Sequence, residues 1–89
     1  QIIAKFRNLF QTMIDYKISH GDMKASNFIY HNEQLIVLDL DGMKRHQSNR
    51  SFKKAIMKDF NRFKKNWRND EYGEEFKSMI DELELLTNS

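Results

Sequence analysis

Two short apolar segments flank a polar turn in the first half of this chain, and this pattern constrains its fold more than any other feature. The segments are residues 27–30 and 35–38, and residues 31–34 between them are polar. We expect a β-hairpin whose second strand is apolar on both faces, as in a buried strand. The hairpin would carry Asn27 at one foot and Asp39 at the other. A hairpin this small is not stable alone, so it needs a helix beneath it.

Three further segments have apolar side chains at the three- and four-residue steps of amphipathic helices. They span about residues 1–17, 52–67 and 72–86, with Ser51 as the expected N-cap of the second. We expect the polar and basic residues 43–50 to form a loop. The predicted helix faces contain Ile2, Ile3, Phe6, Leu9, Phe10, Met13 and Ile14, then Phe52, Ile56, Phe60, Phe63 and Trp67, then Phe76, Met79, Ile80, Leu83 and Leu86. The predicted fold class is therefore α+β and mostly helical, in the order helix, loop, hairpin, helix, helix.

Composition limits the class of protein. The chain has 89 residues, enough for one small domain or part of a larger one. It begins at Gln1 with residues that already look helical, so we expect it to be a piece of a longer protein. The absence of cysteine excludes disulfides and thiolate metal sites, and no apolar run approaches the roughly 18 residues of a membrane-spanning helix. A net charge of +2 is too small to indicate nucleic acid, and we expect no such partner.

Charge is distributed unevenly along the chain. Residues 44–68 contain many lysines and arginines and a single acid, Asp59, whereas residues 70–84 are predominantly acidic. A basic stretch of this kind can meet an anionic substrate or a phospholipid surface, and it can equally be a solvated helix face. The basic residues are Lys44, Arg45, Arg50, Lys53, Lys54, Lys58, Arg62, Lys64, Lys65 and Arg68.

Four polar residues at fixed spacing lie in and after the loop of residues 20–27. Asp22 is placed to orient an attacking hydroxyl or accept its proton, and Lys24 to steady a transferred phosphoryl group as a point charge. Asn27 and Asp39 offer the oxygen ligands that hold Mg²⁺ on nucleotide phosphates. Because this is the order and spacing of a kinase catalytic loop, we expect phosphate transfer from ATP to an alcohol.

Several neighbours of these residues allow two interpretations. Lys24 can pair with Asp22 instead of a phosphate. Asp41 is either a second carboxylate at the metal site or a cap of its loop. We expect His20 to be structural and packed against the hairpin. Asp59 is the candidate to hold the backbone of the loop, with an ion pair to Arg62 as the alternative.

These motifs resemble the lipopolysaccharide kinase family of bacteria, the Kdo/WaaP and InaA-like branch of the kinase superfamily. The resemblance is carried by residues 20–28, 37–43 and 58–67 and extends over about residues 18–67. It implies that residues 1–89 are part of the C-terminal lobe of a protein-kinase-like fold. The N-terminal nucleotide lobe would then lie outside this chain, which alone should be inactive.

The resemblance also implies an activity and a place. It implies phosphorylation of a sugar of the lipopolysaccharide core, with ATP and Mg²⁺, in the cytoplasm at the inner face of the inner membrane. Asp22 would be the base, Asn27 and Asp39 the magnesium ligands, and the basic 44–68 stretch a peripheral membrane contact. Leu40 and Asp41 stand where protein kinases have Phe and Gly, so the activation switch of those enzymes is not expected.

Three alternatives remain. The acceptor can be another small molecule or a protein, because the motif specifies the chemistry better than the substrate. The chain can be a non-catalytic kinase-like module. Residues 38–42 also resemble the nucleophile motif of haloacid-dehalogenase-like phosphatases. Met43 replaces the Thr of that motif, and the residues that follow are too few and too helical for the rest of such an enzyme.

Overall fold

The computed structural model describes residues 1–88, and its secondary structure is mostly helical with two small antiparallel sheets. The predicted α+β class is therefore confirmed. In chain order the elements are α1 (Ile2–Tyr16), β1 (Ile18–Ser19), η1 (Ala25–Asn27), β2 (Phe28–His31), β3 (Gln34–Val37), η2 (Leu40–Gly42), β4 (Lys44–Arg45), α2 (Asn49–Asn66) and α3 (Gly73–Asn88).

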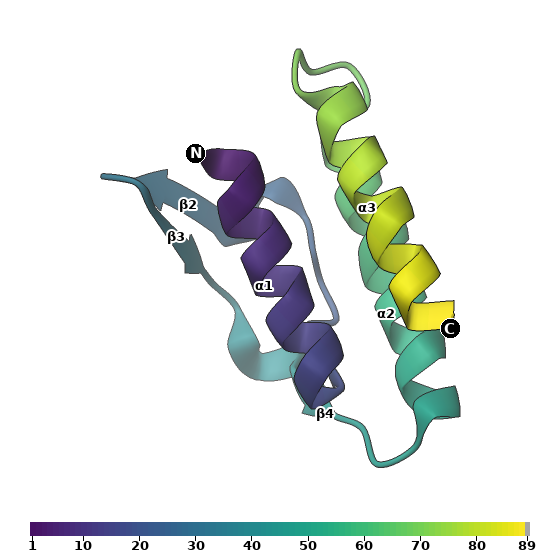
Figure 1. The fold of residues 1–89 in the computed structure, drawn as a ribbon. Helices are drawn as coiled ribbons and strands as arrows, with labels where there is room; N and C mark the ends of the chain where they lie inside the picture. The colour runs from purple at the N-terminus through teal and green to yellow at the C-terminus, as the bar shows by residue number, and fades with distance from the viewer. Residues whose placement is uncertain (89) are drawn as a thin grey trace.

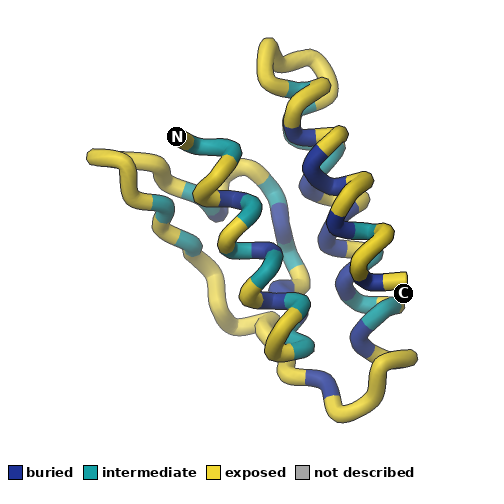
Figure 2. The backbone as a smooth tube through the Cα atoms, viewed as in Figure 1, coloured by how far each residue is buried: buried dark blue, intermediate teal, exposed yellow. Residues whose placement is uncertain are grey.

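Helix α1 lies in the middle of the molecule. Figure 1 shows it between the β2–β3 hairpin on one side and the α2–α3 pair on the other. The buried side chains follow the faces that the helices turn toward each other, while most of the hairpin and the segment after it stay exposed (Figure 2). The hairpin thus packs on a helix, as its small size required.

The core is aromatic and centres on Phe63 of α2, which is fully buried. Its ring lies 4.9 Å from that of Phe6 in α1 and 5.3 Å from that of Phe76 in α3, both edge-on. Phe28 at the start of β2 meets the same ring at 6.0 Å. Edge-to-face packing of this kind adds to the burial of large apolar surface. One side chain therefore joins three helices to the hairpin.

The hairpin is the predicted one, but each of its strands lies one residue closer to the turn than expected. Phe28 pairs with Val37 and His31 with Gln34, so the turn is only two residues long. Asn32 and Glu33 form this turn with positive φ angles of 50° and 61°, as type I′ turns require. The expectation that residues 35–38 form a strand buried on both faces is wrong. Helix α1 packs on one face of β3, but Ile36 on the other face is 45% exposed.

Two expectations for residues 43–51 are also wrong. Residues 43–50 are not all loop, because Lys44–Arg45 pairs with Ile18–Ser19 as a short antiparallel bridge. Helix α2 begins at Asn49, earlier than predicted, and its N-cap is Ser48, whose hydroxyl accepts a hydrogen bond from Ser51 N at 3.1 Å. The Ser51 hydroxyl instead bonds His46 Nδ1 at 2.7 Å. Either serine would be a suitable N-cap. Because the Ser51 hydroxyl contacts His46, Ser48 is the cap.

Candidate functional site

Asp59 of α2 holds the first residues of the 20–27 loop. Its Oδ2 accepts a hydrogen bond from His20 N at 2.7 Å, and its Oδ1 accepts one from Gly21 N at 3.0 Å. The side chain is only 3% exposed. Burial raises the pKa of the carboxyl above its usual value, and the two N–H donors oppose this increase. The expectation that Asp59 fixes the backbone of the loop is confirmed.

Asn66 provides a second anchor, which sequence reasoning missed. Its Nδ2 donates to the carbonyl oxygen of Met23 at 2.7 Å. Arg62 donates from Nη1 to Asn66 Oδ1 at 3.0 Å, so it supports this anchor and not, as the alternative had it, an ion pair with Asp59. Asn66 follows Asp59 by seven residues, about two helical turns, and this spacing was the available signal.

His20 joins the loop to the end of β3. Its Nδ1 accepts a hydrogen bond from Asp22 N at 3.1 Å, which leaves the proton on Nε2 to be donated to Leu38 O at 3.0 Å. The residue is 2% exposed. The predicted structural role of His20 is confirmed, and its contacts fix the backbone on both sides of the site.

The predicted site residues converge at the feet of the hairpin. Leu38 N donates to Asn27 O at 2.7 Å, which continues the strand pairing by one residue toward Asp39. Asn27 Nδ2 donates to the carbonyl oxygen of Asp22 at 2.8 Å. The backbones of Asn27 and Asp39 therefore lie near each other at the feet of the hairpin, as the hairpin pattern predicted, and the Asn27 side chain also links Asp22 to this point.

A close backbone contact presses the loop against the segment after Asp39. Gly21 has a φ of +97°, and a Cβ added there would lie 3.1 Å from the carbonyl oxygen of Gly42. An L side chain at this position would meet both an unfavourable φ and a backbone atom. The contact requires glycine and brings the 20–27 loop and η2 together.

Asp39 is exposed, although it follows a strand that was expected to be buried on both faces. Its carboxylate therefore needs neither an ion pair nor a metal to offset desolvation. Its backbone is left-handed, with φ 55° and ψ 68°, a region that Asp tolerates better than most residues. None of the ion pairs or hydrogen bonds within residues 1–88 engages its carboxylate. Both oxygens are therefore free to accept a ligand.

Asp41 was expected to be either a second carboxylate at the metal site or a cap of its loop. The first interpretation assumed an extended chain after Asp39, but Leu40–Gly42 forms a 3₁₀ turn and Asp41 is exposed. In the described part of the chain, no three His or carboxylate side chains gather into a metal-binding group. Asp41 is thus not clustered with Asp22 and Asp39.

Lys24 lies beside the candidate base. Its Nζ is 3.4 Å from Asp22 Oδ2, and both side chains remain nearly half exposed. The pairing considered for these two residues is therefore present. An exposed ion pair of this kind is weak, so Lys24 can leave Asp22 for a stronger anion at little cost.

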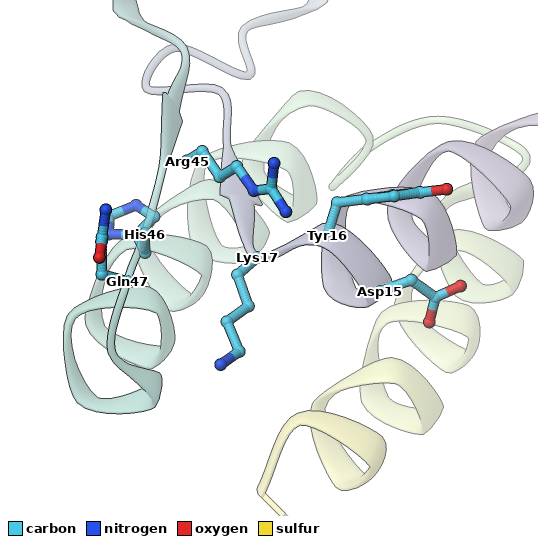
Figure 3. A pocket seen from close by; sticks show the side chains of 6 residues that line it. All are labelled: Asp15, Tyr16, Lys17, Arg45, His46 and Gln47. Carbon is cyan, nitrogen blue, oxygen red and sulfur yellow. The ribbon is translucent and has the colours of Figure 1, made fainter.

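His46 has partners that the sequence did not reveal. Its Nε2 lies 2.8 Å from Ser19 Oγ and its Nδ1 2.7 Å from Ser51 Oγ, so a buried ring connects β1 to the start of α2. Beside it lies a cavity of about 460 Å³ between the end of α1 and residues 45–47 (Figure 3). The lining of this cavity includes neither Asp22, Asn27 nor Asp39. This cavity is therefore separate from the site.

Within residues 1–88, no helix is long and apolar enough to cross a bilayer. Comparisons with protein-family models, with curated proteins and with solved structures find no match to the chain. The case for a function therefore rests on the residues of the loop and on their geometry.

Proposed function

We propose that this chain is the catalytic-loop region of a kinase-like phosphotransferase, which moves the γ-phosphate of ATP to an alcohol with the help of Mg²⁺. The favoured acceptor is a sugar of the lipopolysaccharide core, at the cytoplasmic face of the inner membrane. The observation that carries the proposal is that Asp22 and Asn27 lie on a loop held by Asp59 and Asn66 of α2, while Asp39 directly follows Leu38, whose N–H bonds Asn27 O.

The oxygen atoms at this site are suitable ligands for a magnesium ion. In the hydrogen bond that the Asn27 side chain makes within residues 1–88, the amide nitrogen donates to Asp22 O, and Oδ1 is not used. Asp39 offers a free carboxylate one step beyond the residue paired with Asn27. One amide oxygen and one carboxylate are a typical protein contribution to Mg²⁺, which keeps waters and phosphate oxygens as its other ligands. Bound there, the ion would neutralise charge on the phosphates.

The other residues of the site would have separate roles in the transfer. Asp22 would orient the acceptor hydroxyl and take its proton as the oxygen attacks phosphorus and the bond to the β-phosphate oxygen breaks. Lys24, now paired with Asp22, would move to the oxygens of the transferred group. The anchors Asp59 and Asn66 would keep the loop in place, since small displacements of catalytic groups cost much of the rate.

The exposed side of the hairpin fits a kinase-like lobe that covers it. Ile29 and Ile36 pair directly across the two strands and are 44% and 45% exposed, and Leu38 beside Asp39 is 39% exposed. An apolar strip next to a phosphate site suits the face of a nucleotide base or a packed second lobe. We expect that lobe outside residues 1–89. The haloacid-dehalogenase-like alternative loses further support, because residues 49–88 form two helices joined by a turn and contain no strand.

The proposal is tested with Asp39→Asn in the full-length protein. Magnesium-dependent ATP turnover should fall by orders of magnitude, because the charged metal ligand is lost. Stability should change by less than about 0.5 kcal/mol, since the side chain is exposed and Asn also tolerates the left-handed backbone. Turnover and urea unfolding are measured on the same preparation. Unchanged turnover, or strong unfolding with loss of activity only in proportion, would give Asp39 a structural role instead.

A further inference from the structure

A second hollow lies directly beside the candidate base. It has a volume of about 300 Å³ and is enclosed by the 20–27 loop on one side and α2 on the other. Asp22 and Met23 line the loop side, and Ala55, Lys58 and Arg62 line the helix side. The residues of α2 follow at steps of three and four, so one face of the helix forms the wall, and the short side chain of Ala55 opens it. The size is at the lower end of the ~300–1,000 Å³ of small-molecule sites.

The charges in this cavity are unbalanced. Its two carboxylates already have partners: Asp59 accepts two backbone N–H groups, and Asp22 pairs with Lys24. Its two cations have no acid partner: none of the ion pairs found among residues 1–88 involves Lys58 or Arg62, and the hydrogen bond of Arg62 goes to the neutral side chain of Asn66. By contrast, Lys64 on the same helix pairs with Glu84 of α3 at 3.1 Å.

Keeping these cations unpaired is unfavourable for the free protein. Lys54, Lys58 and Arg62 follow one another at four-residue intervals, all exposed, and like charges at this spacing repel. Only Lys58 and Arg62 also line the cavity. Arg62 uses one nitrogen to hold Asn66 and keeps its other donors free. A point charge and a planar fork one turn apart are the usual means of binding a phosphate or a carboxylate.

We propose that this cavity is the acceptor site, and that Lys58 and Arg62 bind an anionic group, a phosphate or carboxylate, already present on the acceptor sugar. The inference rests on the proposed function and makes it specific. Because Asp22 and both cations line one small cavity, the reacting hydroxyl and the anionic group lie on the same sugar unit or on neighbouring ones. Of the basic residues in the stretch 44–68, the proposal assigns anion binding to Lys58 and Arg62 alone.

The test measures binding, so it is independent of turnover. Full-length protein is titrated by calorimetry with a soluble, lipid-free lipopolysaccharide core oligosaccharide. The same titration is repeated with this oligosaccharide after its phosphates are removed and its carboxyls reduced. The charged form should bind about tenfold more tightly, the gain expected of a charge-assisted hydrogen bond. Lys58→Met should lose most of this preference, and Lys58→Arg should keep it.

The matched control is Lys54→Met, which removes an exposed cation one turn earlier on the same helix but outside the cavity. It should keep the preference for the charged oligosaccharide.

Equal binding of the two oligosaccharides, or no binding of either, would overturn the inference. So would an equal loss in Lys54→Met and Lys58→Met, which indicates a general basic surface. A fall in ATP affinity alone in Lys58→Met would assign the cation to the nucleotide. Failure of phosphate transfer would count against the proposed function and leave this binding result interpretable.

Discussion

Asp59 acts on the candidate catalytic loop through two hydrogen bonds to backbone N–H groups. The two contacts, at 2.7 and 3.0 Å, are made by a side chain that is 3% exposed. Buried N–H groups that lose their acceptor keep the full cost of desolvation. The position of Asp22 therefore depends on a carboxylate that lies 37 positions later in the chain and has no proposed part in the chemistry.

Asp59→Ala should lower the free energy of unfolding by about 3 kcal/mol, because it leaves the N–H groups of His20 and Gly21 unpaired. Urea unfolding followed by circular dichroism measures the change. Asp81→Ala is the matched control, since Asp81 makes only an exposed pair with Lys77 and should cost no more than about 0.5 kcal/mol. Equal effects of the two substitutions would show that Asp59 does not hold the loop.

The titration of Asp59 gives a prediction with a definite sign. Burial raises its pKa in the folded protein above the value of 3.8 that holds for an exposed Asp. Between these two values the folded state binds more protons than the unfolded state, so stability falls as pH rises through this interval. Relative to Asp59→Asn, which does not titrate, the wild type should lose unfolding free energy from about pH 4 upward. Urea unfolding of both proteins over a pH series checks this, and the opposite trend would contradict it.

Residue-level contacts were predictable only where a motif fixed the role. His20 and Asp59 could be assigned because their positions resemble those of a packed His and a buried helix Asp in kinase folds. Asn66 and Ser48 could not. The seven-residue step from Asp59 to Asn66 indicates a shared helix face but no partner, and Ser51 is as suitable a cap as Ser48. The triple contact of Ser19, His46 and Ser51 joins residues far apart in sequence, and it became visible only in the fold.

At the scale of the elements, one face of α2 packs in the core and the adjoining face holds the 20–27 loop. One face buries Phe52, Ile56, Phe60 and Phe63 in the core. The adjoining face presents Asp59 and Asn66 to the loop. The aromatic face fixes the helix against α1 and α3, and the polar groups then hold the loop relative to that rigid frame.

Phe63→Ala should destabilise the protein by about 3–5 kcal/mol, the usual cost of deleting a buried aromatic ring. The ring contacts aromatic side chains of α1, β2 and α3, so the loss affects every layer at once. Thermal unfolding followed by circular dichroism gives the change. Tyr72→Ala, at a position 42% exposed, should stay within about 0.5 kcal/mol. A cost below about 1 kcal/mol for Phe63→Ala would mean that the core does not centre on this ring.

The helices were predictable because their apolar spacing extends over several turns, and only their ends differed. The hairpin was predictable in position, yet its burial was not, since an apolar strand does not reveal which face will be covered. The β1–β4 bridge has two residues in each strand and pairs Ile18 with Arg45 and Ser19 with Lys44, which are 27 and 25 positions apart. Such a short pairing has no periodic pattern and depends on the surrounding packing.

At the scale of the whole molecule, the helices bury an aromatic core, while part of the hairpin leaves apolar side chains exposed. Ile29, Ile36 and Leu38 form an apolar strip on the hairpin next to Asp39. Exposed strips of this kind mark surfaces that meet a partner or a ligand. Under the proposed function, this strip would meet the nucleotide or a second lobe.

The most direct test of phosphotransfer uses the full-length protein, γ-labelled ATP, Mg²⁺ and lipopolysaccharide core, with Asp22→Ala as the control. The account predicts label in the core that disappears in Asp22→Ala. Consumption of ATP that needs Asp22 but leaves the core unlabelled would keep the kinase chemistry and replace the acceptor. No magnesium-dependent turnover of ATP by the wild type would contradict the assignment and leave a non-catalytic module.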